Sequence, residues 1–275
     1  MDIKNESEAN LALDQINKST FHITNIEKKR VKRNPLAPFT TSTLQQDASN
    51  KLGFGASRTM RIAQKLYEGI NIGSETTGLI TYMRTDGVQL SSQAIEELRN
   101  EISNRHGKSY IPDNPRVYKS KAANAQEAHE AIRPTDIARD PESISDYLDA
   151  EQLKLYDLIW KRTISSQMQS AELDETAADI SSKDQSITFR ANGSQVIFPG
   201  FFVYRDKEDD RLLPNLNEKE EVDLSKVESD QHFTQPPPRY TDASLIKKME
   251  ELGIGRPSTY CLLYTSDAAD ELRSV

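Results

Sequence analysis

Segments with β-strand character lie at both ends of this sequence, and a long block with helical character lies between them. Residues 20–33 alternate loosely between apolar and polar side chains, and residues 173–233 contain several short alternating segments. Between them, apolar residues recur every three or four positions. A period of two is typical of strands and a period of 3.6 of helices. The order predicts an α+β protein in which a helical domain is inserted into a β-rich one.

Capping residues divide the helical block into separate helices. Helices are predicted over about 7–18, 42–52, 57–68, 93–106, 126–132, 150–168 and 242–252. The expected N-caps are Ser57, Ser91 or Ser92, and Thr241, and Asp149 with Gln152 matches a capping box. In the helix at 57–68 the expected core stripe is Met60, Ala63, Leu66, Tyr67 and Ile70.

The charge distribution leaves open whether the chain contacts nucleic acid. The net charge is −8, but the acids are concentrated at 136–151 and 205–230. A basic run at 28–33 (KKRVKR) is either a solvated strand face or a DNA contact. The sequence has no apolar run long enough to cross a membrane, and its single cysteine excludes an internal disulfide. We therefore expect a cytoplasmic protein.

Tyr82 and Arg84 form a pattern with evident chemistry. The sequence has no P-loop, GxGxxG, HExxH or GxSxG motif, and its four histidines lack ligand spacing. A tyrosine oxygen can act as a nucleophile, but its ordinary pKa of about 10 means that the proton must be removed during attack. Arg84 can face the same side of an extended segment and suits phosphate. The pair fits phosphoryl transfer, and a packing or rim tyrosine is the ordinary alternative.

The segment GLITYMRTDG, residues 78–87, resembles the active-site motif of type IA DNA topoisomerases, most closely the bacterial topoisomerase I enzymes. Three further segments resemble the same family in the same order. They are residues 38–69, residues 125–136 (AQEAHEAIRPTD) and residues 232–260. The resemblance covers nearly all of residues 20–260.

The resemblance implies that Tyr82 attacks a backbone phosphate and keeps it in a 5′-phosphotyrosyl link. Arg84 would hold that phosphate and stabilise the charged transition state, and Asp86 would order the loop or assist proton movement. The implied DNA-binding residues are His129, Glu130, Arg133, Arg256, Ser258 and Thr259. Gly87 stands where serine is common in the family, so the hydroxyl contact of that serine is absent here.

The resemblance also implies a toroid-forming fold of which this chain is a central fragment. Residues 1–41 and 169–237 would form the β-rich arch domain, 42–168 the helical domain with the tyrosine, and 238–260 the start of a gate domain that binds single-stranded DNA. Residues 261–275 do not continue the family pattern and are expected to be a non-native tail. The family's Toprim domain, which supplies the acidic Mg²⁺ site, is expected to lie outside the chain.

The implied function is transient cleavage of one DNA strand, passage of another, and resealing without ATP, which relaxes negatively supercoiled DNA. Mg²⁺ is the implied cofactor, held by the Toprim domain and by no residue of this fragment. The implied partner is DNA, single-stranded and negatively supercoiled, and the expected protein is a nucleoid-associated monomer without membrane contact. The fragment alone is expected to be inactive. The alternative is a module that binds single-stranded DNA without cutting it.

Overall fold

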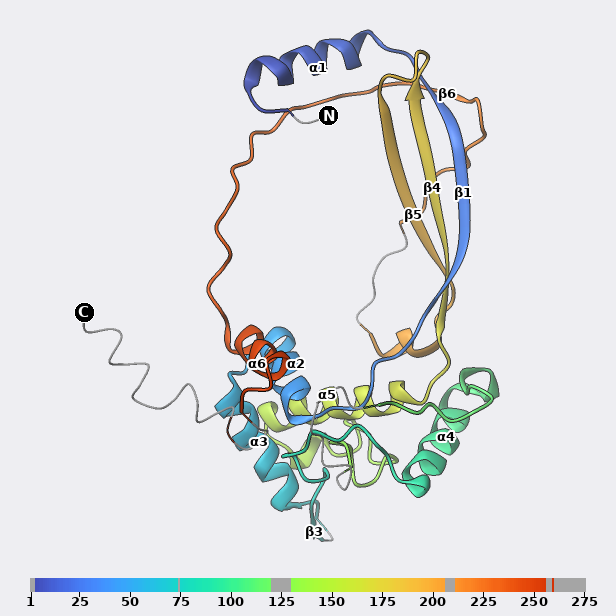
Figure 1. Ribbon diagram of the computed structural model, residues 1–275. Helices are drawn as coiled ribbons and strands as arrows, with labels where there is room; N and C mark the ends of the chain where they lie inside the picture. Colours follow the sequence, from blue (N-terminus) through green and yellow to red (C-terminus); the bar gives the residue numbers. More distant parts are fainter. Residues whose placement is uncertain (1–2, 74, 120–129, 206–210, 256–258, 260–275) are drawn as a thin grey trace, which may run out of the picture. The chain divides into compact units, whose positions relative to one another are not determined.

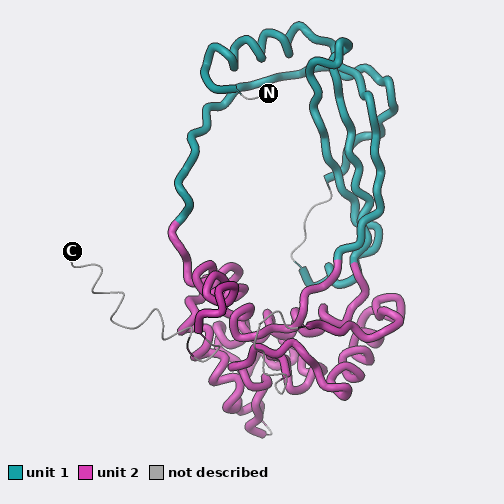
Figure 2. The backbone as a smooth tube through the Cα atoms, in the orientation of Figure 1, with its two compact units in different colours: residues 1–33, 171–238 teal, residues 34–170, 239–275 magenta. Residues whose placement is uncertain are grey.

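The structure is a computed structural model that describes residues 3–73, 75–119, 130–205, 211–255 and 259 (Figure 1). It contains both α-helices and an antiparallel sheet, so the predicted α+β class is confirmed. The chain divides into two compact units: unit 1 comprises residues 1–33 and 171–238, and unit 2 comprises residues 34–170 and 239–275 (Figure 2). The units change after residues 33, 170 and 238, and the domain limits implied by the resemblance stay a prediction.

Unit 1 is built on a four-stranded antiparallel sheet with the order β5–β4–β1–β6 (Figure 1). Its strands are β1 (Phe21–Arg33), β4 (Ala171–Ser182), β5 (Thr188–Phe198) and β6 (Glu221–Val222), and helix α1 (Glu6–Lys18) precedes β1. Phe21, Ile23 and Ala178 are buried on the paired strands. The predicted helix at 7–18 and strand at 20–33 are confirmed.

The apolar segment QVIFPGFFVYR was expected to be a strand, and only its first part is one. β5 ends at Phe198, and Gly200–Tyr204 form the 3₁₀ helix η3. Pro199 adopts helical dihedrals and has no N–H to donate to a sheet, while Gly200 has a φ of +48°. The proline–glycine pair therefore ends the strand inside the apolar run.

The basic run of β1 lies opposite acids of β4. Arg30 donates two hydrogen bonds to the Asp174 carboxylate at 2.8 and 2.9 Å. Lys32 pairs with Glu172 at 3.0 Å, and Arg33 pairs with Glu175 at 2.7 Å. Of the two interpretations left open for this run, the cross-strand pairs favour the charged sheet surface for these three residues.

The described part of unit 2 contains five α-helices: α2 (Thr41–Leu52), α3 (Ala56–Glu68), α4 (Ser92–His106), α5 (Ala150–Ser166) and α6 (Asp242–Glu251). Its short elements are β2 (Ile70–Asn71), β3 (Thr76–Thr77), η1 (Lys108–Tyr110) and η2 (Ser145–Tyr147). The predicted caps at Ser91, Thr241 and the Asp149–Gln152 box are confirmed.

The predicted cap at Ser57 is wrong, because α3 begins one residue earlier. Gly55 is the N-cap residue and has no side chain to offer. The Asp242 carboxylate of α6 instead accepts from the Ala56 N–H at 3.4 Å. A tertiary contact between helices α3 and α6 thus replaces the local cap that the sequence indicated.

The buried face of α3 also differs from the expected stripe. The helix buries Ala56, Thr59, Ile62, Ala63 and Leu66, whereas Tyr67 is 40% exposed and Met60 is half-buried. Thr59 can be buried because its hydroxyl donates to the Gly55 carbonyl at 3.1 Å. The helix is therefore rotated enough to leave Tyr67 at the surface.

Residues 130–134 are extended, although the sequence predicted a helix at 126–132; residues 126–129 lie outside the described part. Ile132 forms an antiparallel bridge with Phe39, and Pro134 forms one with Ile80. Pro134 disfavours helical dihedrals at Arg133, and the bridges to two neighbouring segments satisfy the backbone groups that a helix would have paired internally. This extended segment borders the candidate site.

Candidate active site

The segment from Thr81 to Gly87 presents alternate side chains to solvent. Tyr82 is 45% exposed and Arg84 is exposed. Met83, which lies between them, and Thr85, which follows Arg84, are buried. Exposure at Tyr82 and Arg84 with a buried residue between them agrees with the alternation that the sequence predicted. Asp86 is half-buried.

Thr41, in the first turn of α2, anchors one edge of this segment. Its N–H donates to the Thr85 carbonyl at 2.9 Å, and its hydroxyl oxygen accepts from the Thr85 N–H at 2.9 Å. The same hydroxyl donates to the Met83 carbonyl at 2.7 Å. Thr41 is completely buried. One side chain thus satisfies backbone groups on both sides of Arg84.

The extended segment 130–135 anchors the other edge. The Thr81 N–H donates to the Arg133 carbonyl at 2.9 Å, and the Thr135 N–H donates to the Leu79 carbonyl at 3.0 Å. The Thr81 hydroxyl donates to the Ala131 carbonyl at 2.7 Å and accepts from the Arg133 N–H at 3.0 Å. The residue immediately before the tyrosine is therefore fixed through both its main chain and its side chain.

The start of the segment lies against the C-terminal end of α3. The Leu79 N–H donates to the Leu66 carbonyl at 2.8 Å. A Cβ at Gly78 would lie 2.5 Å from the Tyr67 carbonyl oxygen, so only glycine permits this approach. The approach brings the Tyr67 ring to 5.4 Å from the Tyr82 ring, edge to face. Tyr67 therefore packs directly against the predicted nucleophile.

Gly87 follows this anchored segment without a side-chain hydroxyl. Its N–H donates to the Thr85 hydroxyl at 3.0 Å. The main-chain donor of Gly87 is therefore satisfied by the same buried threonine that Thr41 binds.

Glu130 and Arg133, from the second family segment, bind each other. The Arg133 Nε and one terminal nitrogen donate to the same Glu130 oxygen at 3.1 and 2.9 Å, and the other terminal nitrogen donates to the Pro134 carbonyl. The second Glu130 oxygen accepts from the Ser91 N–H at the start of α4, at 2.8 Å. Glu130 thus links α4 to the strand beside Tyr82. His129 lies outside the described residues.

The same contacts perturb the ionisation of Glu130. Burial raises the pKa of this carboxyl, but the hydrogen bonds from Ser91 and the charge of Arg133 outweigh burial and hold its pKa below the ordinary value of 4.5. The carboxylate is therefore charged at neutral pH and fixes the direction of the Arg133 guanidinium.

The C-terminal family segment enters unit 2 through α6. Ile246 and Met249 of α6 pack on Ala56 at the start of α3, and the Ser42 hydroxyl of α2 donates to the Glu250 carboxylate at 2.6 Å. Gly253, with a φ of +69°, ends the helix. Arg256 and Ser258 lie outside the described residues, and Thr259 is half-buried.

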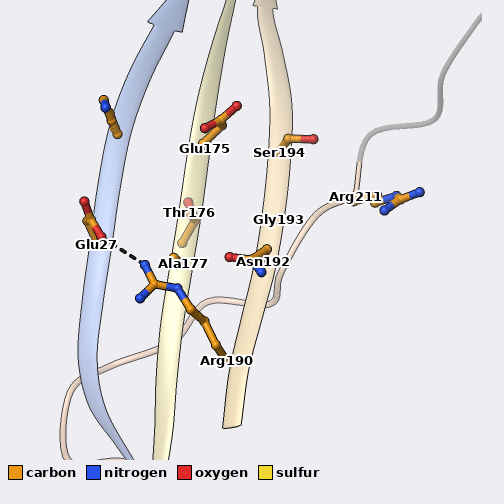
Figure 3. Close-up of a pocket in the computed structure, with 10 residues that line it drawn as sticks. Glu27, Glu175, Thr176, Ala177, Arg190, Asn192, Gly193, Ser194 and Arg211 are labelled. Atoms are coloured by element: carbon orange, nitrogen blue, oxygen red, sulfur yellow. Dashed lines mark hydrogen bonds and ion pairs between the residues drawn. The ribbon is translucent and has the colours of Figure 1, made fainter.

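A separate hollow of about 370 Å³ lies along the strands of unit 1 (Figure 3). Lys29, Arg190 and Arg211 line it together with Glu27 and Glu175. Arg190 is already paired with Glu27 at 3.1 Å, as the dashed line in Figure 3 marks. The lining of this hollow thus mixes cationic and acidic side chains.

No group of three or more His, Cys, Asp or Glu residues that could hold a metal ion occurs among the described residues. The acids of the described residues therefore do not gather into the Mg²⁺ site that the family resemblance implies. Within the same part of the chain, no helix is both long and apolar enough to span a membrane.

Sequence reasoning missed Thr41 and misplaced Tyr67. The run Thr40–Thr43 at a helix start could have indicated capping, and Thr40 and Thr43 do form a capping box. No local pattern indicates that the Thr41 hydroxyl bonds to Met83 and Thr85, which lie 42 and 44 positions later in the chain. Tyr67 has helical spacing to the core stripe, so only the rotation of α3 shows that it faces Tyr82.

The model of a family described as DNA topoisomerase matches residues 1–262. DNA topoisomerase 1 of Rickettsia felis is 52% identical over 265 residues, which cover 94% of this chain and 34% of the relative. DNA topoisomerase 1 of Xylella fastidiosa is 50% identical over 259 residues, which cover 90% of this chain and 32% of that relative. The chain thus spans about a third of the length of the curated relatives it matches.

The fold is similar to that of full-length topoisomerase I from Thermotoga maritima, with a TM-score of 0.81 and 40% sequence identity. The similarity covers 91% of this chain and 41% of that protein. Sequence and fold agree over nearly the whole chain, and on that evidence the chain belongs to the DNA topoisomerase family.

Proposed function

We propose that this chain is the strand-cleaving segment of a type IA DNA topoisomerase and that Tyr82 is the nucleophile. The observation that carries the proposal is the anchored segment around Tyr82, where Tyr82 and Arg84 face solvent and Met83 and Thr85 are buried. A nucleophile and a phosphate-binding guanidinium are thereby presented side by side on a fixed backbone.

In the proposed reaction the Tyr82 oxygen attacks the phosphorus of a DNA phosphodiester and loses its proton. The bond from phosphorus to the 3′ oxygen breaks, and that oxygen takes up a proton. The products are a 5′-phosphotyrosine and a 3′-hydroxyl, and Arg84 binds the phosphate oxygens as their charge develops. Resealing is the same reaction in reverse, so it needs no ATP. Asp86 orders the loop or assists the proton movement.

Arg133 and Glu130 have a more specific place in this proposal. Arg133 binds DNA near the cut, and Glu130, which holds its guanidinium, aims it instead of contacting DNA. His129, Arg256, Ser258 and Thr259 keep their proposed roles as contacts to DNA. Mg²⁺ is proposed to be held by parts of a longer protein, since the relatives are about three times as long as the match.

The proposed substrate is single-stranded or negatively supercoiled DNA, bound by a monomer at the bacterial nucleoid. Unit 1 corresponds to the arch domain, residues 34–170 to the helical domain, and residues 239–260 to the start of the gate domain.

Covalent capture of DNA tests the proposal. Residues 1–262 would replace the matching segment of the Rickettsia felis relative, and adducts with a labelled oligonucleotide would be resolved on a denaturing gel. We expect adducts with Tyr82 and none with Tyr82→Phe, while both proteins bind DNA. Adducts that persist in the Phe variant would assign the nucleophile elsewhere. DNA binding without any adduct in either protein would favour the non-catalytic binding module.

A further inference from the structure

Thr41 occupies an unusual position for a residue at the start of a helix. Its backbone N–H and its hydroxyl both bond to residues of the Tyr82 segment and not to its own helix. The neighbouring Thr40 supplies the cap of α2 together with Thr43. The hydroxyl of Thr41 is therefore not needed to begin the helix.

The hydrogen bonds of Thr41 satisfy main-chain groups of the Tyr82 segment that a neighbouring strand would satisfy in a sheet. The Thr41 N–H to Thr85 carbonyl bond is an ordinary main-chain contact, but the Thr85 N–H finds the Thr41 hydroxyl where a carbonyl would be in a sheet. The hydroxyl hydrogen is then directed to the Met83 carbonyl at 2.7 Å, with the Thr85 carbonyl at 3.1 Å. All of these groups are at buried residues, so water does not substitute for them.

We propose that Thr41 is a positioning residue for strand cleavage, which fixes the backbone on both sides of Arg84 and so sets the direction of the Tyr82 and Arg84 side chains. Its part in cleavage rests on the proposed function, whereas its hold on the loop does not. Thr41 touches no DNA in this proposal. Without its hydroxyl, the Thr85 N–H and the Met83 carbonyl lose their partner, and the loop shifts to find others.

Valine and serine at position 41 separate the hydroxyl from the shape of the side chain. Thr41→Val keeps the approximate volume and removes only the hydrogen bonds of the hydroxyl, whereas Thr41→Ser keeps the hydroxyl. The matched control is Thr163→Val. Thr163 is an equally buried threonine of the same unit, and its hydroxyl donates to the Ile159 carbonyl within α5 at 2.8 Å.

The first measurement is hydrogen exchange of peptides covering residues 79–90 in the 275-residue chain. We expect faster exchange in this segment for Thr41→Val, and parent exchange for Thr41→Ser and Thr163→Val. Parent exchange in Thr41→Val would overturn the inference. This result stands whether or not the protein cleaves DNA, so it separates a failure of the inference from a failure of the proposed function.

The second measurement is single-turnover cleavage at saturating oligonucleotide in the Rickettsia felis chimera. We expect Thr41→Val to lose about 100-fold in the cleavage rate with unchanged DNA affinity, since small misplacement of reacting groups has effects of this order. Thr41→Ser should restore the rate to within about threefold of the parent, and Thr163→Val should keep it. Equal losses of cleavage rate in Thr41→Val and Thr163→Val would show that Thr41 acts only through general packing and would overturn the inference.

Should Thr41→Val fail to fold, Thr41→Cys provides the same test. Cysteine keeps a side chain of similar size with a weak donor and acceptor. The amides of residues 79–90 should therefore exchange faster in Thr41→Cys than in Thr41→Ser, and the cysteine variant should cleave DNA more slowly. A cysteine variant that matches the parent in both measurements would overturn the inference.

Discussion

Strand β1 and the irregular segment around Tyr82 both carry an arginine at the surface, but the two arginines have different partners. The Arg30 guanidinium makes two hydrogen bonds to Asp174 on the neighbouring strand. Arg84 is exposed and forms no ion pair with any residue that the structure describes, while its backbone neighbours are tightly bonded. Two of the Arg30 donors are committed to Asp174 on an exposed strand, whereas the whole planar fork of Arg84 is available for the phosphate of the proposed reaction. In that proposal, position in the fold matters more than local charge density.

The largest expected difference between the two regions is in catalysis. In the Rickettsia felis chimera, Arg84→Lys keeps the charge but loses the planar fork, so we expect cleavage to fall about 100-fold. The matched change Arg30→Lys should leave the rate within about twofold. The check is single-turnover cleavage on a denaturing gel. An Arg84→Lys rate equal to that of Arg30→Lys would remove the distinction.

The 275-residue chain by itself should show the difference in DNA binding. We expect weak binding to single-stranded DNA, with a log–log salt slope of about −2 to −3, and no relaxation of supercoiled plasmid with or without Mg²⁺. Arg84→Ala should make the slope shallower by about 0.7, the value for one phosphate on a single strand, and Arg30→Ala should not change it. Fluorescence anisotropy over a salt series gives the slopes. Relaxation that depends on Mg²⁺ would place a metal site within this chain.

The contacts of Glu130 beside the Tyr82 segment predict a pH-dependent contribution to stability. Because its folded pKa lies below the ordinary 4.5, its contacts stabilise the protein above that pH, and the contribution is lost as pH falls through the lowered pKa. Glu130→Gln should therefore cost less than about 1 kcal/mol at pH 7, since a third of the side chain is exposed, and still less near pH 3.

Urea unfolding of the 275-residue chain at the two pH values measures the effect of Glu130→Gln. Glu97→Gln is the control, because Glu97 lies on the exposed surface of α4, where it accepts from Gln93. A constant difference between Glu130→Gln and the parent at both pH values would contradict the assigned contacts.

The smallest effect is expected for the β1–β4 pairs. Both partners of the Arg30–Asp174 pair are exposed, so water and salt screen their attraction. A double-mutant cycle with Arg30→Ala and Asp174→Ala should give a small coupling that disappears in about 0.5 M NaCl. A large coupling that survives salt would show that this ladder is a principal source of stability in unit 1.

The sequence predicted most helices and the long β1 strand because their patterns are local. Ser91 caps the helix that follows it, and Asp149 with Gln152 forms the expected box. The predictions failed where a tertiary contact replaced the local one. Asp242 took the place of a cap at Ser57, and bridges to Phe39 and Ile80 kept residues 130–134 extended.

The sequence by itself determined that Arg84 stands two residues after Tyr82, the proposed nucleophile, in an alternating pattern that leaves both exposed. Such alternation depends only on neighbouring residues. Tertiary structure alone decided how that segment is held, through Thr41, Thr81 and the Tyr67 ring. It also decided that Arg30 is paired while Arg84 stays exposed. These outcomes depend on partners that are separated in the chain, from 15 residues for Tyr67 and Tyr82 to 144 for Arg30 and Asp174, and local patterns cannot specify them.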